Sequence, residues 1–453
     1  LLADDTAPTF PDIDRDRLRF LETRQARQAA EDVPLDSKTR LSIQGLPGTG
    51  KTWALLSIAR HHAAAGKRVL FLCYNQVLHA DLQRIGAGID ASTFREHVDF
   101  HTLFGFYEQF AANARIEPST YDDATAEIWI ALMAEELAAH PDRPVYDLIV
   151  VDEAQDMLDP LEPVLRHCIA VDGSIVVAVG LGQELYRESA DWLDRFQSVA
   201  KEQRYTDVYR TPAASFCVAQ ALRESAVDEK LICPNIRRIV DGHCVVPAFL
   251  QVDLRNPGTT VPALSVIPGP ARPGDDLEAH WSRELGKVFE SARRRLRGDE
   301  VPRDILFLLP SSKSVLRNPL MRAIGDAGFG VADLIGDKQR VPAPQEVRIS
   351  TYHSARGVEA RVVVLLDLAK LLENNPNHRN AQTLAYIGLT RSLRDTILVE
   401  ERERRSRIGE MIEEIGERVR YEIDRERPRF LELNQANLPD GYFADDGDDP
   451  PID

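Results

Sequence analysis

The sequence predicts an α/β protein with two parallel sheets, and three observations support this prediction. Short, nearly unbroken apolar runs recur along the chain, as expected for parallel strands that are buried on both faces. Segments with helical periodicity alternate with these runs. A glycine-rich turn separates an apolar stretch beginning at Leu41 from the helical residues 53–59. The other apolar runs cover residues 68–74, 148–151, 175–179, 305–309 and 362–366.

Length and composition limit the kinds of protein that this chain can be. The 453 residues correspond to two or three domains at about 150 residues each. With 72 acidic against 55 basic residues, the net charge is −17. This charge excludes a protein held on nucleic acid or membrane by bulk positive charge alone. Hydrophobic residues make up 43% and charged residues 28%, which is typical of a soluble globular chain.

The five cysteines form no C-x-x-C pair, so we expect reduced thiols in the core rather than a zinc or iron–sulfur site. They are Cys73, Cys168, Cys217, Cys233 and Cys244. No apolar run approaches the roughly 18 residues of a membrane span, and the N-terminal residues lack a secretory signal. We therefore expect a cytoplasmic protein without membrane contact. Because residue 1 is leucine, a further domain upstream is left open.

We place a domain boundary near residue 200, where a charged stretch precedes a second series of strands and helices. The predicted domains are residues 1–200 and 201–430. Seven prolines within 233–273 indicate an irregular insertion in the second domain. The acidic residues 431–453 form a tail that we expect to be disordered.

Two helices are predicted in the second domain from apolar residues at helical spacing. The first covers about residues 275–296 and carries a core-facing stripe. The second covers about 400–425 and packs by one edge. The stripe residues are Leu277, Trp281, Leu285, Val288, Ala292 and Leu296 in the first, and Ile408, Ile412, Ile415 and Val419 in the second.

Residues 45–52 match the pattern G-x-x-x-x-G-K-[ST] completely. Glycines let consecutive backbone N–H groups turn toward phosphate oxygens, and the start of the following helix adds a favourable dipole. The lysine neutralises the β- and γ-phosphates, and the final threonine can bind Mg²⁺. We therefore expect an ATP·Mg²⁺ site formed by Gly45, Gly48, Thr49, Gly50, Lys51 and Thr52.

An acidic run, Asp152-Glu153-Ala154-Gln155-Asp156, directly follows the apolar run 148–151. Ligands of open α/β sheets bind at the carboxyl ends of the strands. Asp152 is expected to hold Mg²⁺ through water, and Glu153 to polarise the attacking water as general base. The second carboxylate favours hydrolysis over a kinase or a nucleotide sensor.

This pentad resembles motif II of the UvrD/Rep-like branch of superfamily 1 helicases. Segments resembling the other motifs follow in the family's order between about residues 25 and 395. The resemblance implies two RecA-like P-loop NTPase domains with ATP at their interface and single-stranded DNA across both. DNA is favoured over RNA only by the family.

Two segments resemble the motifs that line the single-strand path in this family, and a third resembles motif V. Residues 72–76 resemble motif Ia, 100–104 resemble motif Ib, and 351–359 resemble motif V with Arg356 in place of the usual lysine. Aromatic and small polar side chains suit this path, because they stack on bases and bind phosphates without reading sequence. Taken singly, Tyr74 and Phe104 are more often core residues than ligand contacts. The candidate nucleic-acid contacts are Tyr74, Asn75, Thr102, Phe104, Tyr186, Thr351, Tyr352 and His353.

Further motifs implied by the resemblance supply nucleotide contacts from the second domain. Tyr209 would stack on the adenine and Arg210 would reach the γ-phosphate, as in motif IV. Gly357 and Glu359 of motif V would lie at the nucleotide, with Glu359 accepting hydrogen bonds from the ribose. Residues 386–392 resemble motif VI, so Arg391 is the candidate arginine finger, which stabilises charge on the γ-phosphoryl group.

The chain departs from the family at two motifs. In the motif III segment, Gln183 and Tyr186 are retained, with Gln183 expected to sense the γ-phosphate. Gly180 stands where the family has an aspartate. Both Gln25 and Gln28 lie near the position of the adenine-reading glutamine, and we favour Gln25.

The chain is also too short for the family's large insertions. Only a small helical 1B insertion, at about residues 105–143, fits between the motifs, and a full 2B subdomain does not. The resemblance therefore indicates a compact helicase module of the type found beside nuclease-related domains, in DNA repair or in phage defence. We expect an ATP-dependent translocase or helicase, 3′ to 5′ by family. The alternative is an ATPase switch that licenses a partner nuclease with little unwinding.

Overall fold

The structure is a computed structural model, which describes residues 24–116, 125–181, 191–225, 243–246, 250–254, 256, 258–270, 276–338, 340–375 and 378–435. The chain divides into two compact units, each described by itself below. The first unit contains Leu1–Tyr205, Gly298–Asp304 and Gly328–Val358. The second unit contains Thr206–Arg297, Ile305–Ala327 and Glu359–Asp453.

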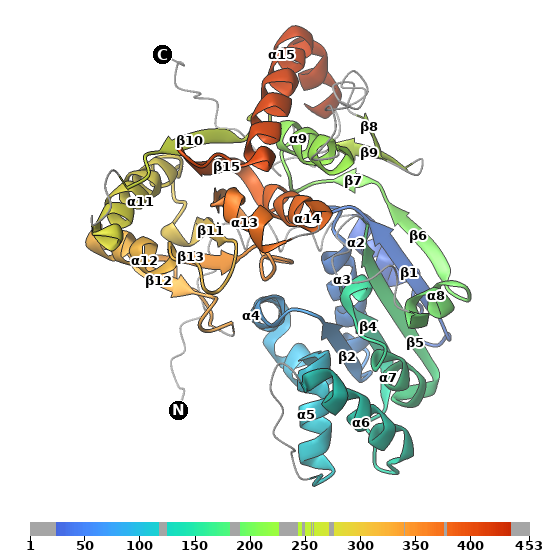
Figure 1. Cartoon of the computed structure of the whole chain (residues 1–453). Coiled ribbons are helices and arrows are strands. Elements are labelled where there is room, and N and C mark those ends of the chain that lie inside the picture. The colour runs from blue at the N-terminus through green and yellow to red at the C-terminus, as the bar shows by residue number, and fades with distance from the viewer. Residues whose placement is uncertain are drawn as a thin grey trace. The chain divides into compact units, whose positions relative to one another are not determined.

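A six-stranded sheet with the order β3-β2-β4-β5-β1-β6 organises the first unit (Figure 1). All neighbouring strands run parallel. A parallel sheet of this kind needs helices on both faces, so a strand such as Val69–Cys73 is buried and apolar throughout. The strands are β1 (Arg40–Gly45), β2 (Val69–Cys73), β3 (Val98–Thr102), β4 (Tyr146–Val151), β5 (Ile169–Gly180) and β6 (Lys201–Tyr205).

The helices of the first unit cover both faces of this sheet. Strand β2 shows the alternation, because Leu70 and Leu72 join one hydrophobic cluster whereas Val69 and Phe71 join the other. Helices α5 to α8 contribute to the first cluster and α2 to α4 to the second. The helices are α2 (Arg24–Glu31), α3 (Lys51–Ala64), α4 (Gln76–His97), α5 (Leu103–Asn113), α6 (Ala126–Ala139), α7 (Leu161–His167) and α8 (Asp191–Gln197).

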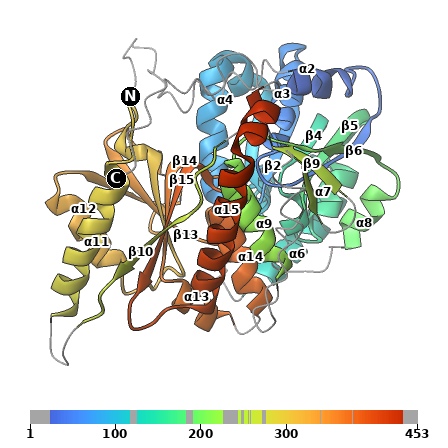
Figure 2. The ribbon, with the colours of Figure 1, turned by 90° about the horizontal axis from the view of Figure 1, so that it is seen from above.

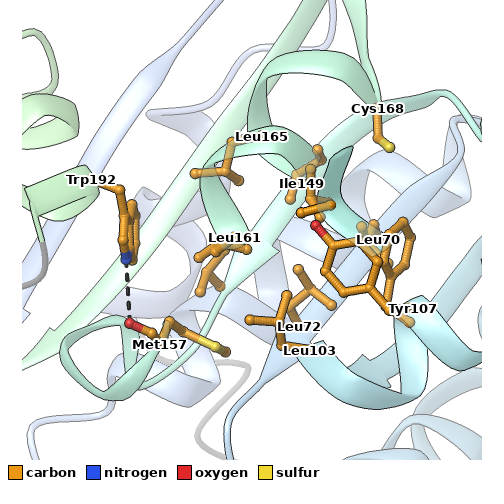
Figure 3. Close-up of a cluster of buried hydrophobic side chains, with 14 of the residues drawn as sticks. Leu70, Leu72, Leu103, Tyr107, Ile149, Met157, Leu161, Leu165, Cys168 and Trp192 are labelled. Atoms are coloured by element: carbon orange, nitrogen blue, oxygen red, sulfur yellow. Dashed lines mark hydrogen bonds between the residues drawn. The ribbon is translucent and has the colours of Figure 1, made fainter. Parts of the chain in front are cut away.

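Figure 3 shows the first cluster, where Tyr107 and Leu103 of α5 lie among side chains of β2, β4 and α7. The Trp192 indole of α8 closes the cluster and donates a hydrogen bond to the Met157 carbonyl at 3.3 Å. Helix α6 falls within the predicted helical insertion, 105–143, and α5 begins two residues before it, at Leu103. They are packed into the core beneath the sheet.

A second sheet has the strand order β10-β15-β14-β11-β13-β12. The pairs β10–β15, β15–β14, β14–β11 and β13–β12 are parallel. The two parallel sheets together confirm the predicted α/β class. The strands are β10 (Ala263–Ile267), β11 (Ile305–Leu309), β12 (Gly330–Asp333), β13 (Glu346–Thr351), β14 (Ala360–Leu366) and β15 (Ser392–Glu401).

Of the second sheet, β10, β11, β14 and β15 belong to the second unit, whereas β12 and β13 belong to the first. Within its described residues, the second unit also carries a small three-stranded sheet and six helices. The sheet has the order β7-β9-β8, with β7–β9 parallel and β8–β9 antiparallel. In Figure 2, α15 lies beside α9 of the same unit, and α9 also packs against α14. These elements are β7 (Asp207–Val208), β8 (His243–Val246), β9 (Leu250–Leu254), α9 (Ala213–Glu224), α11 (Leu277–Arg293), α12 (Arg317–Asp326), α13 (Leu368–Asn374), α14 (His378–Leu389) and α15 (Arg407–Gln435).

The predicted helix at 400–425 begins later than expected. Residues 392–401 continue as β15, and the helix starts at Arg407 and extends to Gln435. The predicted stripe is nevertheless confirmed, because Ile408, Ile412, Ile415 and Val419 are all buried. The stripe predicted over 275–296 is confirmed in part: Leu285, Val288 and Ala292 are buried, Trp281 is half-buried and Leu277 is 55% exposed. Its last member, Leu296, is half-buried and lies beyond the end of α11 at Arg293. Leu277 begins the helix next to its N-cap, Asp276.

Three further expectations concern the domain boundary, the irregular segment and the acidic tail. Strand β6 lies in the first sheet just beyond the proposed boundary at residue 200, and the domain boundaries stay a prediction. Three elements, β8 to β10, fall within the irregular segment 233–273. The acidic tail 431–453 begins within α15, and its residues from 436 onward lie outside the described part.

The described cysteines agree with the prediction of core thiols. Cys73, Cys168 and Cys217 are buried thiols that form no disulfide bond. Cys233 lies outside the described residues, and Cys244 belongs to β8. Within the described residues, no helix is long and apolar enough to cross a membrane.

Candidate nucleotide-binding site

The glycine-rich loop joins β1 to α3 in a conformation that needs its glycines. Gly48 and Gly50 have φ angles of 79° and 82°, in the left-handed region that side chains rarely adopt. A Cβ atom on Gly45 would lie 2.5 Å from the Thr49 Oγ1. Helix α3 starts at Lys51, so the loop delivers the chain directly to a helix N-terminus. This is the geometry that cradles phosphate.

The lysine of the loop folds back over it. The Lys51 Nζ donates hydrogen bonds to the carbonyl oxygens of Gly45 at 2.9 Å and Leu46 at 3.0 Å. The side chain is buried, with 7% of its surface exposed. The ammonium group therefore stands at the phosphate loop, where it fits the predicted contact with β- and γ-phosphates.

The structure separates the two glutamine candidates upstream of the loop. The Gln25 Nε2, on α2, donates a hydrogen bond to the Thr49 carbonyl at 2.8 Å. Gln28 is exposed, and its Nε2 donates to the Asp32 Oδ1 at 3.4 Å. Gln25 is thus the one that the structure places on the phosphate loop.

Thr52 and Asp152 meet at the carboxyl end of β4. The Thr52 hydroxyl donates to the Asp152 Oδ2 at 2.7 Å, and Asp152 is fully buried. Paired hydroxyl and carboxylate oxygens beside a phosphate loop are ligands that Mg²⁺ prefers. These two residues therefore fit the ion that the sequence predicts here.

The charge state of Asp152 depends on its surroundings. Burial, followed by the neighbouring Glu153 charge, raises its pKa to about 6, against the opposing effects of the Thr52 hydrogen bond and the Lys51 ammonium. Two carboxylates side by side in a buried site thus favour a proton on one of them, until a cation arrives.

Mg²⁺-dependent nucleotide binding is expected to weaken as the pH falls through about 6, because only the ionised Asp152 binds the ion. One pH unit below that value, the effect on affinity approaches about tenfold. Without Mg²⁺ the pH dependence of stability has the opposite sign. A raised folded-state pKa stabilises the fold at low pH, and this contribution is lost as the pH rises through about 6.

The measurement is the thermal shift given by ADP with Mg²⁺ relative to ADP alone, between pH 5 and 8. The control is Asp152→Asn, in which this difference should not vary with pH beyond the titration of ADP itself. An identical pH profile in both proteins would contradict the assignment.

Glu153 occupies a strained position beyond the strand. Its φ of 50° is left-handed, and its N–H donates to the Asp152 Oδ1 at 2.9 Å. Its Oε2 accepts a hydrogen bond from the Gln155 Nε2 at 2.7 Å. The carboxylate is 8% exposed and is held at the end of β4 beside Asp152. Strain of this kind is typical of functional sites.

The glycine at the motif III aspartate position has a structural reason. The Gly180 N–H, at the end of β5, donates to the Gln155 Oε1 at 2.8 Å. A Cβ atom on Gly180 would lie 2.8 Å from the Glu153 Oε2 and 3.0 Å from the Gln155 Nε2. The space an aspartate would need is therefore taken by these two side chains. Gln183 and Tyr186 lie outside the described residues.

The motif V loop, residues 351–358, is held at two places by segments that follow strands β2 and β4 of the first sheet. Asn75, the N-cap of α4, donates from Nδ2 to the carbonyls of Ser354 at 2.8 Å and Arg356 at 3.2 Å. The Arg356 guanidinium pairs with the Asp156 carboxylate in a buried ion pair. Gly357 has a φ of 74°, and a Cβ there would lie 2.5 Å from the Leu78 Cδ1.

The other predicted nucleic-acid residues of the first unit differ in accessibility. Tyr74 is 38% exposed, and Phe104 is half-buried against the first hydrophobic cluster. Thr102 caps α5 by accepting a hydrogen bond from the Gly105 N–H at 3.0 Å.

Three more candidates stand on the motif V loop. The Thr351 Oγ1 accepts from the Ser354 N–H at 3.1 Å. Tyr352 is completely buried in the described conformation. His353 is half-buried, and burial lowers its pKa. Of the three, His353 has the most accessible side chain, and their roles toward nucleic acid stay predictions.

The second unit carries the remaining candidates. The Arg210 Nη1 lies 3.3 Å from the Glu359 Oε2, in a partly buried ion pair. The Tyr209 hydroxyl donates to the Asp207 Oδ2 at 3.4 Å. Arg391 is 1% exposed, and its Nε donates to the Ile387 carbonyl at 3.0 Å. The structure thus joins Arg210 with Glu359, two residues that the sequence assigned separately to the nucleotide.

Sequence reasoning assigned no role to two residues of this site. Gln155 and Asp156 belong to the acidic pentad, but their partners stand at Gly180 and Arg356, far along the chain. The signal that could have found them is their place in the pentad, next to the general-base candidate.

Comparison with known proteins supports a helicase-like first half of the chain. Residues 38–237 match the family described as Schlafen group 3, DNA/RNA helicase domain. No curated protein matches the chain. Among solved structures, a variant of S. cerevisiae Dbp5 bound to RNA and ADP BeF3 is similar, with 12% identity, coverage of 95% of this chain and 99% of that chain, and a TM-score of 0.46. The family match includes the phosphate loop, Asp152, Glu153 and Arg210, and so covers most of the site described above.

Proposed function

We propose that this chain is a nucleic-acid-stimulated ATPase that moves 3′ to 5′ along single-stranded DNA. The observation that carries the proposal is the meeting of Lys51, Thr52, Asp152 and Glu153 around one phosphate loop. The similarity to a helicase-domain family supports the nucleic-acid part. The resemblance to UvrD/Rep-like motifs supports DNA and the direction.

In the proposed reaction, the N–H groups of the loop and the Lys51 ammonium bind the β- and γ-phosphates of ATP. Thr52 and Asp152 would hold Mg²⁺, which supplies charge neutralisation for the phosphoryl group. Glu153 would take a proton from the attacking water. Its carboxylate is oriented for this by Gln155 and by the backbone turn at residue 153.

The residues of the second unit enter the proposal through the resemblance. Arg210 and Arg391 would stabilise charge on the γ-phosphoryl group, Tyr209 would stack on the adenine, and Glu359 would bind the ribose. RecA-like domains at 1–200 and 201–430, with ATP between them, belong to the same proposal.

A second candidate is a switch that hydrolyses ATP on DNA and licenses a partner nuclease, with little unwinding. It is favoured by the packing of α5 and α6, which share the core of the first sheet. Family members often contact a duplex through large insertions, whereas the described helices of this segment belong to the core of the first sheet. A strand-displacement assay distinguishes the two functions, because the switch should leave an annealed strand in place.

The test of the proposed function is steady-state ATP hydrolysis with and without single-stranded DNA or RNA. We expect stimulation by DNA of about tenfold or more, equivalent to roughly 1.4 kcal/mol of transition-state stabilisation. Glu153→Gln should abolish it. Hydrolysis that is indifferent to both nucleic acids would show that the proposal is wrong.

A further inference from the structure

A chain of polar contacts leads from the motif V loop to the general-base candidate. The Arg356 guanidinium pairs with Asp156, and the Asp156 Oδ2 also lies 3.4 Å from the Gln155 Nε2. The same Nε2 donates to the Glu153 Oε2 at 2.7 Å. Two side chains, those of Asp156 and Gln155, thus connect Arg356 of the loop with Glu153.

The orientation of Gln155 in this chain of contacts is fixed by the backbone. The Gly180 N–H can only donate, so the amide oxygen of Gln155 must face it, at 2.8 Å. The amide nitrogen is then turned toward the two carboxylates. Because Gly180 has no side chain, nothing displaces the amide from this position. Gln155 therefore has one hydrogen-bonding arrangement in which all its contacts are satisfied.

The ion pair at the other end is deeply buried. The side chains of Arg356 and Asp156 are 2% and 1% exposed. A buried pair gains little net stability over an apolar pair of similar shape, whereas loss of one partner leaves an uncompensated charge. The role of this ion pair is therefore better explained by the positions in which it holds neighbouring side chains than by a contribution to the stability of the fold.

The loop that carries Arg356 is seated closely on the first sheet. Asn75 holds two of its carbonyls, at Ser354 and Arg356. Gly357 packs where a Cβ would collide with Leu78. Because Arg356 lies between these two contacts, a change in the position of this loop is expected to move its guanidinium relative to Asp156.

We propose that Arg356, Asp156 and Gln155 are positioning residues. Through them, the position of the motif V loop sets the orientation of the Glu153 carboxylate. Because Thr351 and His353 stand on the same loop, a nucleic acid strand that contacts them would act on hydrolysis through these residues. This inference rests on the proposed function and names the route by which the strand would stimulate it.

The test compares variants at both ends of the route. Gln155→Ala removes the donor to Glu153, and we expect kcat to fall by about tenfold or more with KM for ATP and affinity for ADP within about twofold. Arg356→Gln combined with Asp156→Asn replaces the ion pair by two neutral amides. In this double variant the ratio of DNA-stimulated to basal turnover should fall by about fivefold or more. The single variant Arg356→Lys keeps the positive charge, and it should retain at least half of the wild-type ratio of DNA-stimulated to basal turnover.

The double variant is chosen because a single change would leave a buried charge and could prevent folding. Gln203→Ala is the matched control, because the Gln203 Nε2 also donates to a carboxylate, Asp32, at 3.2 Å, in the same unit. It should keep wild-type kcat and stimulation. Parallel losses of kcat and ADP affinity would indicate a merely structural role and overturn the proposal. So would a wild-type stimulation ratio in the double variant.

The experiment distinguishes failure of the proposed function from failure of the positioning role. If neither DNA nor RNA stimulates the wild-type chain, the proposed function is wrong. The positioning role is then judged by the basal kcat of Gln155→Ala alone. A tenfold fall at unchanged ADP affinity supports the role of Gln155, and an unchanged kcat overturns it.

Discussion

Replacement of Glu153 by glutamine is expected to leave ATP binding nearly unchanged and to slow hydrolysis by roughly 10²–10⁴-fold, the usual contribution of a general base. Glutamine has the shape of glutamate, and its carbonyl oxygen can still accept the hydrogen bond that the Gln155 Nε2 now donates at 2.7 Å. It cannot accept a proton from water. The loss should therefore fall on kcat, with the phosphate loop intact.

The measurement is a pair of titrations, ATP turnover and binding of a fluorescent ADP analogue. Glu202→Gln is the control, because Glu202 stands on β6 with its side chain 44% exposed, and the same chemical change there should have no effect. Turnover of Glu153→Gln at the wild-type rate would remove Glu153 from the mechanism.

Replacement of Lys51 by alanine is expected to weaken ADP and ATP binding by roughly 10–100-fold, because charge-assisted hydrogen bonds to phosphate contribute about 1.5–3 kcal/mol. The buried ammonium group stands over the carbonyls of Gly45 and Leu46, at the loop that would hold the phosphates. Its loss removes the one side-chain cation of the loop itself.

Affinity is measured by calorimetric or fluorescence titration with ADP and Mg²⁺. The matched control is Lys38→Ala, an exposed lysine of the same unit, which should keep wild-type affinity. Unchanged nucleotide affinity in Lys51→Ala would contradict the role of the phosphate loop. A melting temperature lowered in the absence of nucleotide would indicate that the Lys51 hydrogen bonds also stabilise the apo loop.

The apolar central strands could be predicted from the sequence, because full burial on both faces leaves an unmistakable run such as residues 69–73. Edge strands carry no such signal. Strand β6, with the sequence Lys-Glu-Gln-Arg-Tyr, has one neighbour and mostly solvated side chains, so its residues resemble a charged linker. The start of the last helix was misplaced for a related reason, since the polar end of β15 lies beside the helical charge pattern.

The contacts of the candidate site also differ in how far they could be predicted from the sequence. Contacts within the phosphate loop, and between Thr52 and Asp152, follow from a local pattern whose geometry is fixed by strand, turn and helix. The pairing of Arg356 with Asp156 joins residues 200 positions apart. No local pattern encodes such a contact, because it depends on the packing of a whole loop.

The packing of α5 and α6 has a consequence for engineering of the chain. Tyr107, Phe110 and Trp129 of these helices share their apolar surroundings with Leu72 and Ile149 of the sheet. Deleting the helices would strip one face of the sheet and present it to water, at a cost that a domain of ordinary stability does not survive. A minimal version of this protein therefore has to keep both helices, and shortening is better directed at chain segments that lend no side chains to either core.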